Sequence, residues 1–96
     1  MLFAGERGGD SIVIGECAIG MVTIANISTT ATVRYRYFPH IASPVTSYVD
    51  LCTGAPVHPA ISGPTASGRI FVYYVNVSGA LAMKWSNDLG KIWYDG

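Results

Sequence analysis

The side chains with the widest chemical repertoire in this sequence are two cysteines, Cys17 and Cys52, and two histidines, His40 and His58. On paper, Cys17, His40 and Asp50 could supply the nucleophile, the base and the orienting carboxylate of a thiol triad. No local pattern around them supports that chemistry, because a free cysteine usually behaves as a small hydrophobic residue. His58 stands between a valine and a proline and is typical of a loop.

Metal, phosphate and glycoside chemistry are also poorly supported by residue spacing. Two cysteines and two separated histidines match no familiar zinc pattern. Gly5, Gly8 and Gly9 lack the Lys and Ser or Thr that complete a phosphate-binding loop. Asp88 and Asp95 could form a carboxylate pair, but Asp88 is expected to hold a turn. The sequence therefore predicts no catalytic residues, no metal and no cofactor, and hence a protein that is not an enzyme.

Charge is sparse and balanced, with six basic and six acidic residues and a formal net charge of zero. The basic residues are scattered, so the sequence predicts neither nucleic-acid binding nor attachment to anionic membranes. No stretch is apolar enough for a membrane-spanning helix, and no basic segment precedes an apolar run as in a signal peptide. Without that signal, Cys17 and Cys52 are expected to be free thiols, with one disulfide as the alternative.

The composition indicates assembly. Half of the 96 residues are apolar and 12% are charged, against a typical charged share of about 25%. A chain of this size buries only about 60–65% of its unfolded surface. We therefore expect apolar surface to be covered by other copies of the chain or by other structural proteins. A surface rich in Ser, Thr, Asn and Gly is the alternative.

Beta-branched and aromatic residues punctuated by Gly and Pro predict an all-β fold, an antiparallel meander or small sandwich-like domain. We expect a single β domain over residues 1–96. It would comprise a loose leader at 1–10, N-terminal strands within 11–38, an irregular Pro- and Gly-rich arm at 39–68 and a meander at 69–96.

Strands are expected at residues 11–16, 21–27 and 31–38, with one more short strand near 47–52. In the third strand, alternation places Val33, Tyr35 and Tyr37 on one face and Arg34 and Arg36 on the other. We expect the arginines to face solvent or a partner.

The last strands are separated by a segment with a recognisable spacing. Ser86, Asp88, Gly90 and Trp93 match the pattern S-x-D-x-G-x-T-W, with an isoleucine where threonine is usual. The segment resembles the Asp box, or BNR repeat, found in sialidase-like propellers and some phage tail and fibre proteins. With its preceding hairpin, the resemblance covers residues 69–93 only. It implies a fold-stabilising turn that lies away from the active site of sialidases, and 96 residues cannot close a propeller whose blades need roughly 40–50 residues each.

The chemistry of these residues predicts a stable turn independently of the family resemblance. Asp88 can accept hydrogen bonds from the backbone N–H groups of its own turn, and the hydroxyl of Ser86 can do likewise. Gly90 can take the positive φ that a tight turn demands. Trp93 can bury a large area and anchor the hairpin.

Aromatic side chains are the better lead to function. Tyr73, Tyr74, Trp85 and Tyr94 could form an interaction surface, because aromatic residues are enriched in subunit contacts as well as in cores. A sugar-stacking surface is the alternative use of these residues.

Together these features predict a non-catalytic structural or interaction protein that acts within a larger assembly. The preferred form is a virion component, such as a phage tail, fibre or capsid-associated protein. It would reach a virion or another extracellular assembly without a signal peptide, or otherwise stay in the cytoplasm. The alternative is a carbohydrate-binding module or a fragment of an Asp-box propeller glycosidase, with a glycan as partner.

Overall fold

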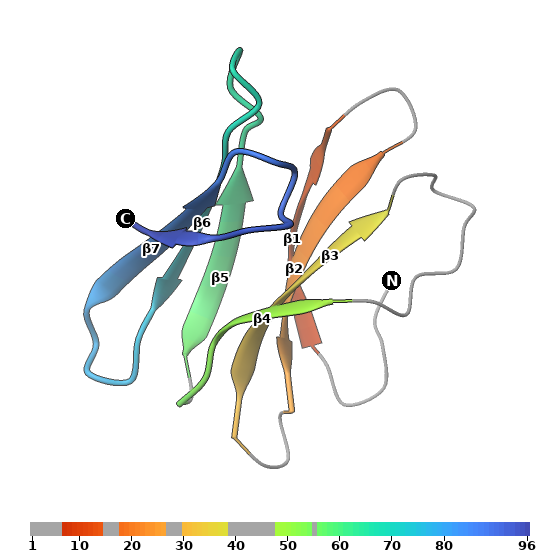
Figure 1. Ribbon diagram of the computed structural model, residues 1–96. Helices are drawn as coiled ribbons and strands as arrows, with labels where there is room; N and C mark the ends of the chain where they lie inside the picture. Colours follow the sequence, from red (N-terminus) through yellow and green to blue (C-terminus); the bar gives the residue numbers. More distant parts are fainter. Residues whose placement is uncertain (1–6, 15–17, 27–29, 39–47, 55) are drawn as a thin grey trace.

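The computed structural model describes residues 7–14, 18–26, 30–38, 48–54 and 56–96, and in them the chain is all-β (Figure 1). Two antiparallel sheets of four strands each follow one another along the chain, in the orders β1-β2-β3-β4 and β5-β6-β7-β8. The strands are β1 (Arg7–Val13), β2 (Ile19–Ala25), β3 (Thr32–Phe38), β4 (Val49–Cys52), β5 (Val57–Ser62), β6 (Ile70–Val75), β7 (Leu81–Ser86) and β8 (Tyr94–Asp95). The predicted all-β class and the sandwich-like arrangement are confirmed.

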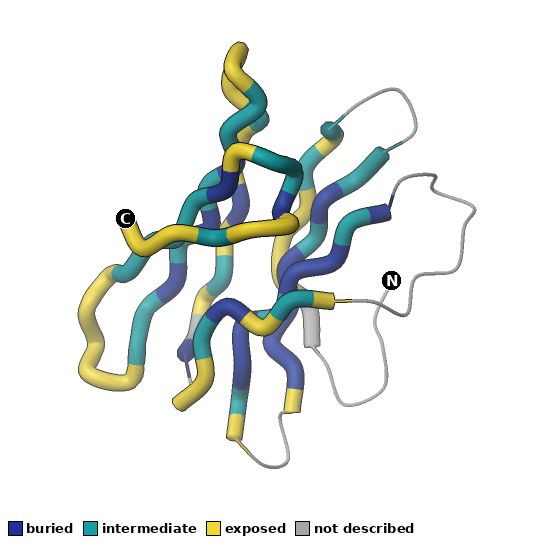
Figure 2. Tube along the Cα trace, in the orientation of Figure 1, coloured by how far each residue is buried: buried dark blue, intermediate teal, exposed yellow. Residues whose placement is uncertain are grey.

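The core lies between the two sheets and draws on both. Strand alternation sends every second side chain inward, and the inward residues of β2 to β6 form one cluster. Its buried members are Val22, Ile24, Val33, Tyr35, Leu51, Ile61, Ile70, Val72 and Tyr74. Figure 2 shows β2 and β3 buried along most of their length, whereas the β6–β7 hairpin tip and β8 are exposed.

The sheets are joined along one side, where β5 lies next to β1 and β2. Asp10 on β1 links them directly, because its Oδ2 accepts a hydrogen bond of 3.1 Å from the backbone N–H of Ile61 on β5. Gly9 is required at this point, since a Cβ atom there would overlap the carbonyl oxygen of Val22. The chain itself crosses from β4 to β5 through a short connection that contains the buried Pro56.

The first sheet corrects one expectation about the arginines. Val33 and Tyr35 do face the core, and Tyr37 packs against it. The opposite face of β3 is also shielded, however, and Arg36 is only 5% exposed. Arg34 forms a two-pronged ion pair with Asp50 on β4, with Nε–Oδ1 and Nη2–Oδ2 distances of 2.7 and 3.2 Å. The prediction that the arginines face solvent or a partner is therefore wrong for Arg36, which the chain itself shields, whereas Arg34 stays partly exposed beside Asp50.

Two expectations about irregular segments are also wrong. β1 begins at Arg7, inside the expected leader; residues 1–6 lie outside the described part. The expected arm contains β4, close to the short strand predicted there, and β5, which was not predicted. Pro59 interrupts the sequence pattern of β5, yet the strand accommodates this proline through a register shift between Val57 and Ala60.

The second sheet contains the expected C-terminal meander, β6 to β8, with β5 added at its edge. The β6–β7 turn is held by Asn76, whose Oδ1 accepts hydrogen bonds of 3.1 Å from the backbone N–H groups of Ser78 and Ala80. Cross-strand pairing places Phe71 opposite Trp85 and Tyr73 opposite Met83. These residues alternate with core residues, so they lie on the outer face of this sheet.

Candidate functional site

The segment between β7 and β8 is a compact turn built on two side chains. The hydroxyl of Ser86, which is fully buried, donates to Oδ1 of Asp88 at 2.7 Å and accepts from the backbone N–H of Gly90 at 2.9 Å. Oδ1 of Asp88 accepts in turn from the backbone N–H groups of Lys91 and Ile92, at 3.1 and 3.0 Å. The hydrogen bonds expected of Ser86 and Asp88 are therefore present.

The same contacts keep Asp88 ionised. The backbone N–H of Ile92 and the hydroxyl of Ser86, in that order, hold the pKa of the Asp88 carboxyl below its ordinary value. A carboxylate that already satisfies several N–H groups is a structural acceptor. Asp95, the other member of the expected carboxylate pair, forms an ion pair with Lys84 across the strands.

The turn rests on the core through Tyr35 of the first sheet. Its hydroxyl donates a hydrogen bond of 2.8 Å to the carbonyl of Leu89. Gly90 has a φ of 96°, as expected, and packs so closely that an added Cβ would overlap the Tyr35 ring. Trp93 meets the same ring edge-on, with centroids 5.1 Å apart, and its Nε1 donates to the Gly90 carbonyl at 2.8 Å. Desolvation by burial, above all, raises the pKa of Tyr35.

The predicted interaction residues divide between two faces. Tyr73, Trp85 and Tyr94 share the outer face of the second sheet, where the Trp85 and Tyr94 rings lie 4.7 Å apart. Tyr74 is 6% exposed and belongs to the core face, so it is not part of that surface. Consecutive residues of a strand point to opposite faces, which is why Tyr73 and Tyr74 separate. Burial raises the pKa of Tyr74 to about 12.

Further residues complete the outer face. Phe71 stacks with Tyr73 at a centroid distance of 6.4 Å. The guanidinium of Arg69 lies 4.3 Å from the Trp85 ring centroid, and its Nε donates to Oδ1 of Asn87 at 3.0 Å. The alternation of the RIFVYYV run could have predicted Phe71; the position of Arg69 depends on contacts that no local pattern encodes. We call this surface, made by Arg69, Phe71, Tyr73, Met83, Trp85 and Tyr94, the aromatic face.

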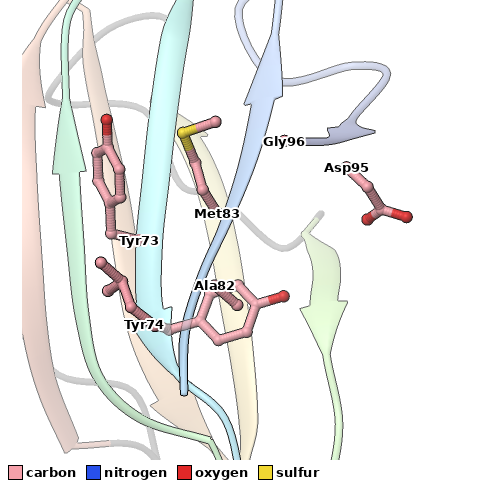
Figure 3. Close-up of a pocket in the computed structure, with 7 residues that line it drawn as sticks. Tyr73, Tyr74, Ala82, Met83, Asp95 and Gly96 are labelled. Atoms are coloured by element: carbon pink, nitrogen blue, oxygen red, sulfur yellow. The ribbon is translucent and has the colours of Figure 1, made fainter.

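One edge of the aromatic face is open. β8 pairs with β7 only at Lys84 and Trp85, and Gly96 adds one hydrogen bond of 3.0 Å to the Met83 carbonyl. No β8 residue lies opposite Leu81, which is 73% exposed. A cavity of about 440 Å³ occupies this edge. Figure 3 shows side chains that line it, and strand register assigns Tyr73 and Met83 to one face of the sheet and Tyr74 and Ala82 to the other.

The remaining candidate residues either make contacts within the fold or lie outside the residues that the structure describes. Cys17 and His40 are not among the described residues, and the thiol triad lies outside the description with them. Asp50 pairs with Arg34. Cys52 is a free thiol whose Sγ lies 3.2 Å from the Thr53 carbonyl, and His58 is an exposed residue of β5. Within the described ranges, no three His, Cys, Asp or Glu residues are grouped to hold a metal ion.

The Gly90 contact predicts a steric penalty that a matched glycine lacks. Gly79 also has a positive φ, 85°, but among the described residues no atom lies within 4 Å of the point that a Cβ atom would occupy. Gly79→Ala should lose about 1–2 kcal/mol of unfolding free energy through backbone strain. Gly90→Ala should lose roughly 1–3 kcal/mol more through the clash with Tyr35. Urea unfolding of both variants measures the difference, and equal losses would contradict the close packing.

The lowered pKa of Asp88 predicts a pH-dependent contribution to stability. A carboxyl whose folded pKa is below its unfolded value stabilises the fold above about pH 3.9. That contribution disappears as the pH falls through the folded pKa. Asp88→Asn should therefore be less stable than the parent near neutral pH, and the gap should close in acid. Thermal melts of the two proteins across an acid-to-neutral pH series test this; a constant gap would refute it.

No helix of the described part could cross a membrane. Comparison of the chain with protein families, with curated proteins and with solved structures gave no match. The function is therefore inferred from the contacts and exposed surfaces of the chain itself.

Proposed function

We propose that this chain is a non-catalytic structural or interaction protein that works within a larger assembly and contacts its partner through the aromatic face. The observation that carries the proposal is the partial exposure of the aromatic face, on the side of the second sheet that points away from the core. Aromatic and methionine side chains are enriched where proteins contact one another. Tyr94 is 46% exposed, and Leu81 lies at the adjoining edge.

The open edge supports the same proposal. The N–H and C=O groups of an unpaired strand edge attract another strand. Here β7 extends past the end of β8, and the cavity beside Leu81 is lined by side chains from both faces of the sheet. A partner that seats an extended segment against β7 would satisfy the edge and cover apolar surface at once.

Three carboxylates of the described residues support a non-catalytic role, because each contributes to the fold. Asp50 binds Arg34, Asp95 binds Lys84, and Asp88 binds the backbone of its turn. Within assemblies, we favour a virion component such as a tail, fibre or capsid-associated protein. The low charged share of 12% and the resemblance of residues 69–93 to hairpins of phage tail and fibre proteins support that form.

A glycan-binding module is the second candidate, and the stack on Trp85 favours it. Arg69 and Tyr94 both contact the Trp85 ring, and Asn87 fixes Arg69 by a hydrogen bond. Aromatic rings bordered by fixed polar groups suit the apolar face and hydroxyls of a sugar. Glycan-array binding that Trp85→Ala abolishes would favour this candidate over assembly.

The assembly proposal predicts self-association that depends on Leu81. Leu81→Asp places a charge at the open edge and should weaken association at least roughly tenfold, because burying an unpaired charge is costly. Val13→Asp is the matched control, since Val13 is 71% exposed on β1 in the first sheet. Analytical ultracentrifugation at micromolar concentration measures the effect. A well-folded parent that stays a monomer, or equal behaviour of the two variants, would contradict the proposal.

A further inference from the structure

The aromatic face carries one charged residue, Arg69, which directly precedes β6. The other residues of that face are aromatic or methionine side chains. A partner that covers Trp85 also covers the guanidinium, whose carbon lies 4.3 Å from the centroid of the Trp85 ring. Removing a charged group from water is costly unless the partner supplies the opposite charge. Arg69 therefore restricts which partners suit the face.

Contacts within the chain hold Arg69 in place. Its backbone N–H donates to Oγ1 of Thr65 at 3.1 Å, and its carbonyl accepts from the N–H of Thr65 at 2.9 Å. Its Nε donates to Oδ1 of Asn87 at 3.0 Å, while the guanidinium stacks on Trp85. A side chain that is fixed before binding loses little conformational entropy when a partner meets it.

The far end of the guanidinium is unused. Among the described residues, Nη1 and Nη2 of Arg69 have no hydrogen-bond or ion-pair partner. Neither atom is buried, so both can be reached from outside. The two parallel N–H groups at this end of an arginine match the two oxygens of a carboxylate. Arg69 therefore offers a fixed pair of donors within an aromatic surface.

The distribution of acids indicates that the partner on this face is a different protein. The aromatic face contains no acid, so two copies that met through it would bring two arginines together without a carboxylate between them. The acids of the described ranges are already engaged in the fold: Asp10 by the Ile61 N–H, Asp50 by Arg34, Asp88 by its turn and Asp95 by Lys84. A contact between copies at the Leu81 edge is separate from this face.

We propose that the aromatic face binds another protein through an acidic side chain, Asp or Glu, that is flanked by apolar residues. The carboxylate pairs with Nη1 and Nη2 of Arg69, and the apolar flanks cover the neighbouring rings. Trp, Tyr and Arg contribute most of the binding energy in many protein interfaces, and this face combines all three. The inference rests on the proposed assembly role and adds the chemistry of the partner.

The test is an NMR titration of the full chain with the acetylated and amidated pentapeptide Thr-Val-Glu-Val-Thr. Saturable shifts are expected at the Nε–H of Arg69 and at the indole N–H of Trp85. The same peptide with Gln in place of Glu should bind at least roughly tenfold more weakly, because it lacks the charge. Inorganic phosphate and glucuronate, which lack the apolar flanks, should also bind more weakly. Equal affinity for either anion would indicate a general anion site and overturn the assignment to a protein.

Arg69→Met keeps an unbranched side chain against Trp85 but removes the guanidinium, so it should abolish the preference for the Glu peptide over the Gln peptide. Lys91→Met is the matched control, because it removes the same charge from an exposed residue outside the aromatic face and should leave the preference unchanged. The amide spectrum of each variant checks its fold.

The two proposals can fail separately. Self-association that depends on Leu81, together with equal or absent binding of the two peptides, would overturn this inference and leave the assembly role standing. A parent that stays a monomer and binds neither peptide would overturn both.

Discussion

The contact between Tyr35 and the β7–β8 turn connects the two halves of the molecule. Its ring stands in the core of the first sheet, and its hydroxyl holds a carbonyl that belongs to the second half of the chain. Gly90 and Trp93 close on the same ring. The hydrogen bonds of Ser86 and Asp88 shape the turn from within, whereas Tyr35 sets where it lies relative to β3 and β4. The direction in which β8 leaves the turn follows from that placement.

The outer faces of the two sheets, which point away from the core, differ in composition and exposure. The outer face of β3 carries Thr32 and Arg36, which are buried. The outer face of β6 and β7 carries Phe71, Tyr73 and Trp85, which are partly exposed. Shielded polar residues beside exposed aromatic residues are the reverse of the usual arrangement in a small soluble domain. This contrast is the physical basis for proposing a partner contact on the second sheet.

Local sequence patterns predicted the features that depend on residues close together in the chain. Strand alternation predicted that Val33 and Tyr35 face the core, and they do. The spacing of Ser86 and Asp88 predicted a turn held by side-chain oxygens, and the hydrogen bonds of both residues are present. Features that depend on distant segments were missed. The shielding of Arg36 and the strand that contains Pro59 arise from tertiary packing. No window of sequence contains the partners that produce them.

The hydrogen bond between Asp10 and the Ile61 N–H affects how further chains could add to the edges of the second sheet. It occupies the β5 side of the second sheet with a carboxylate from β1, while the β7 side stays open beside Leu81. A sheet with two receptive edges can add copies without limit and form a fibre. A sheet with one receptive edge can join a single further edge and then stops. Pairing through this sheet would therefore end in a closed complex of defined size.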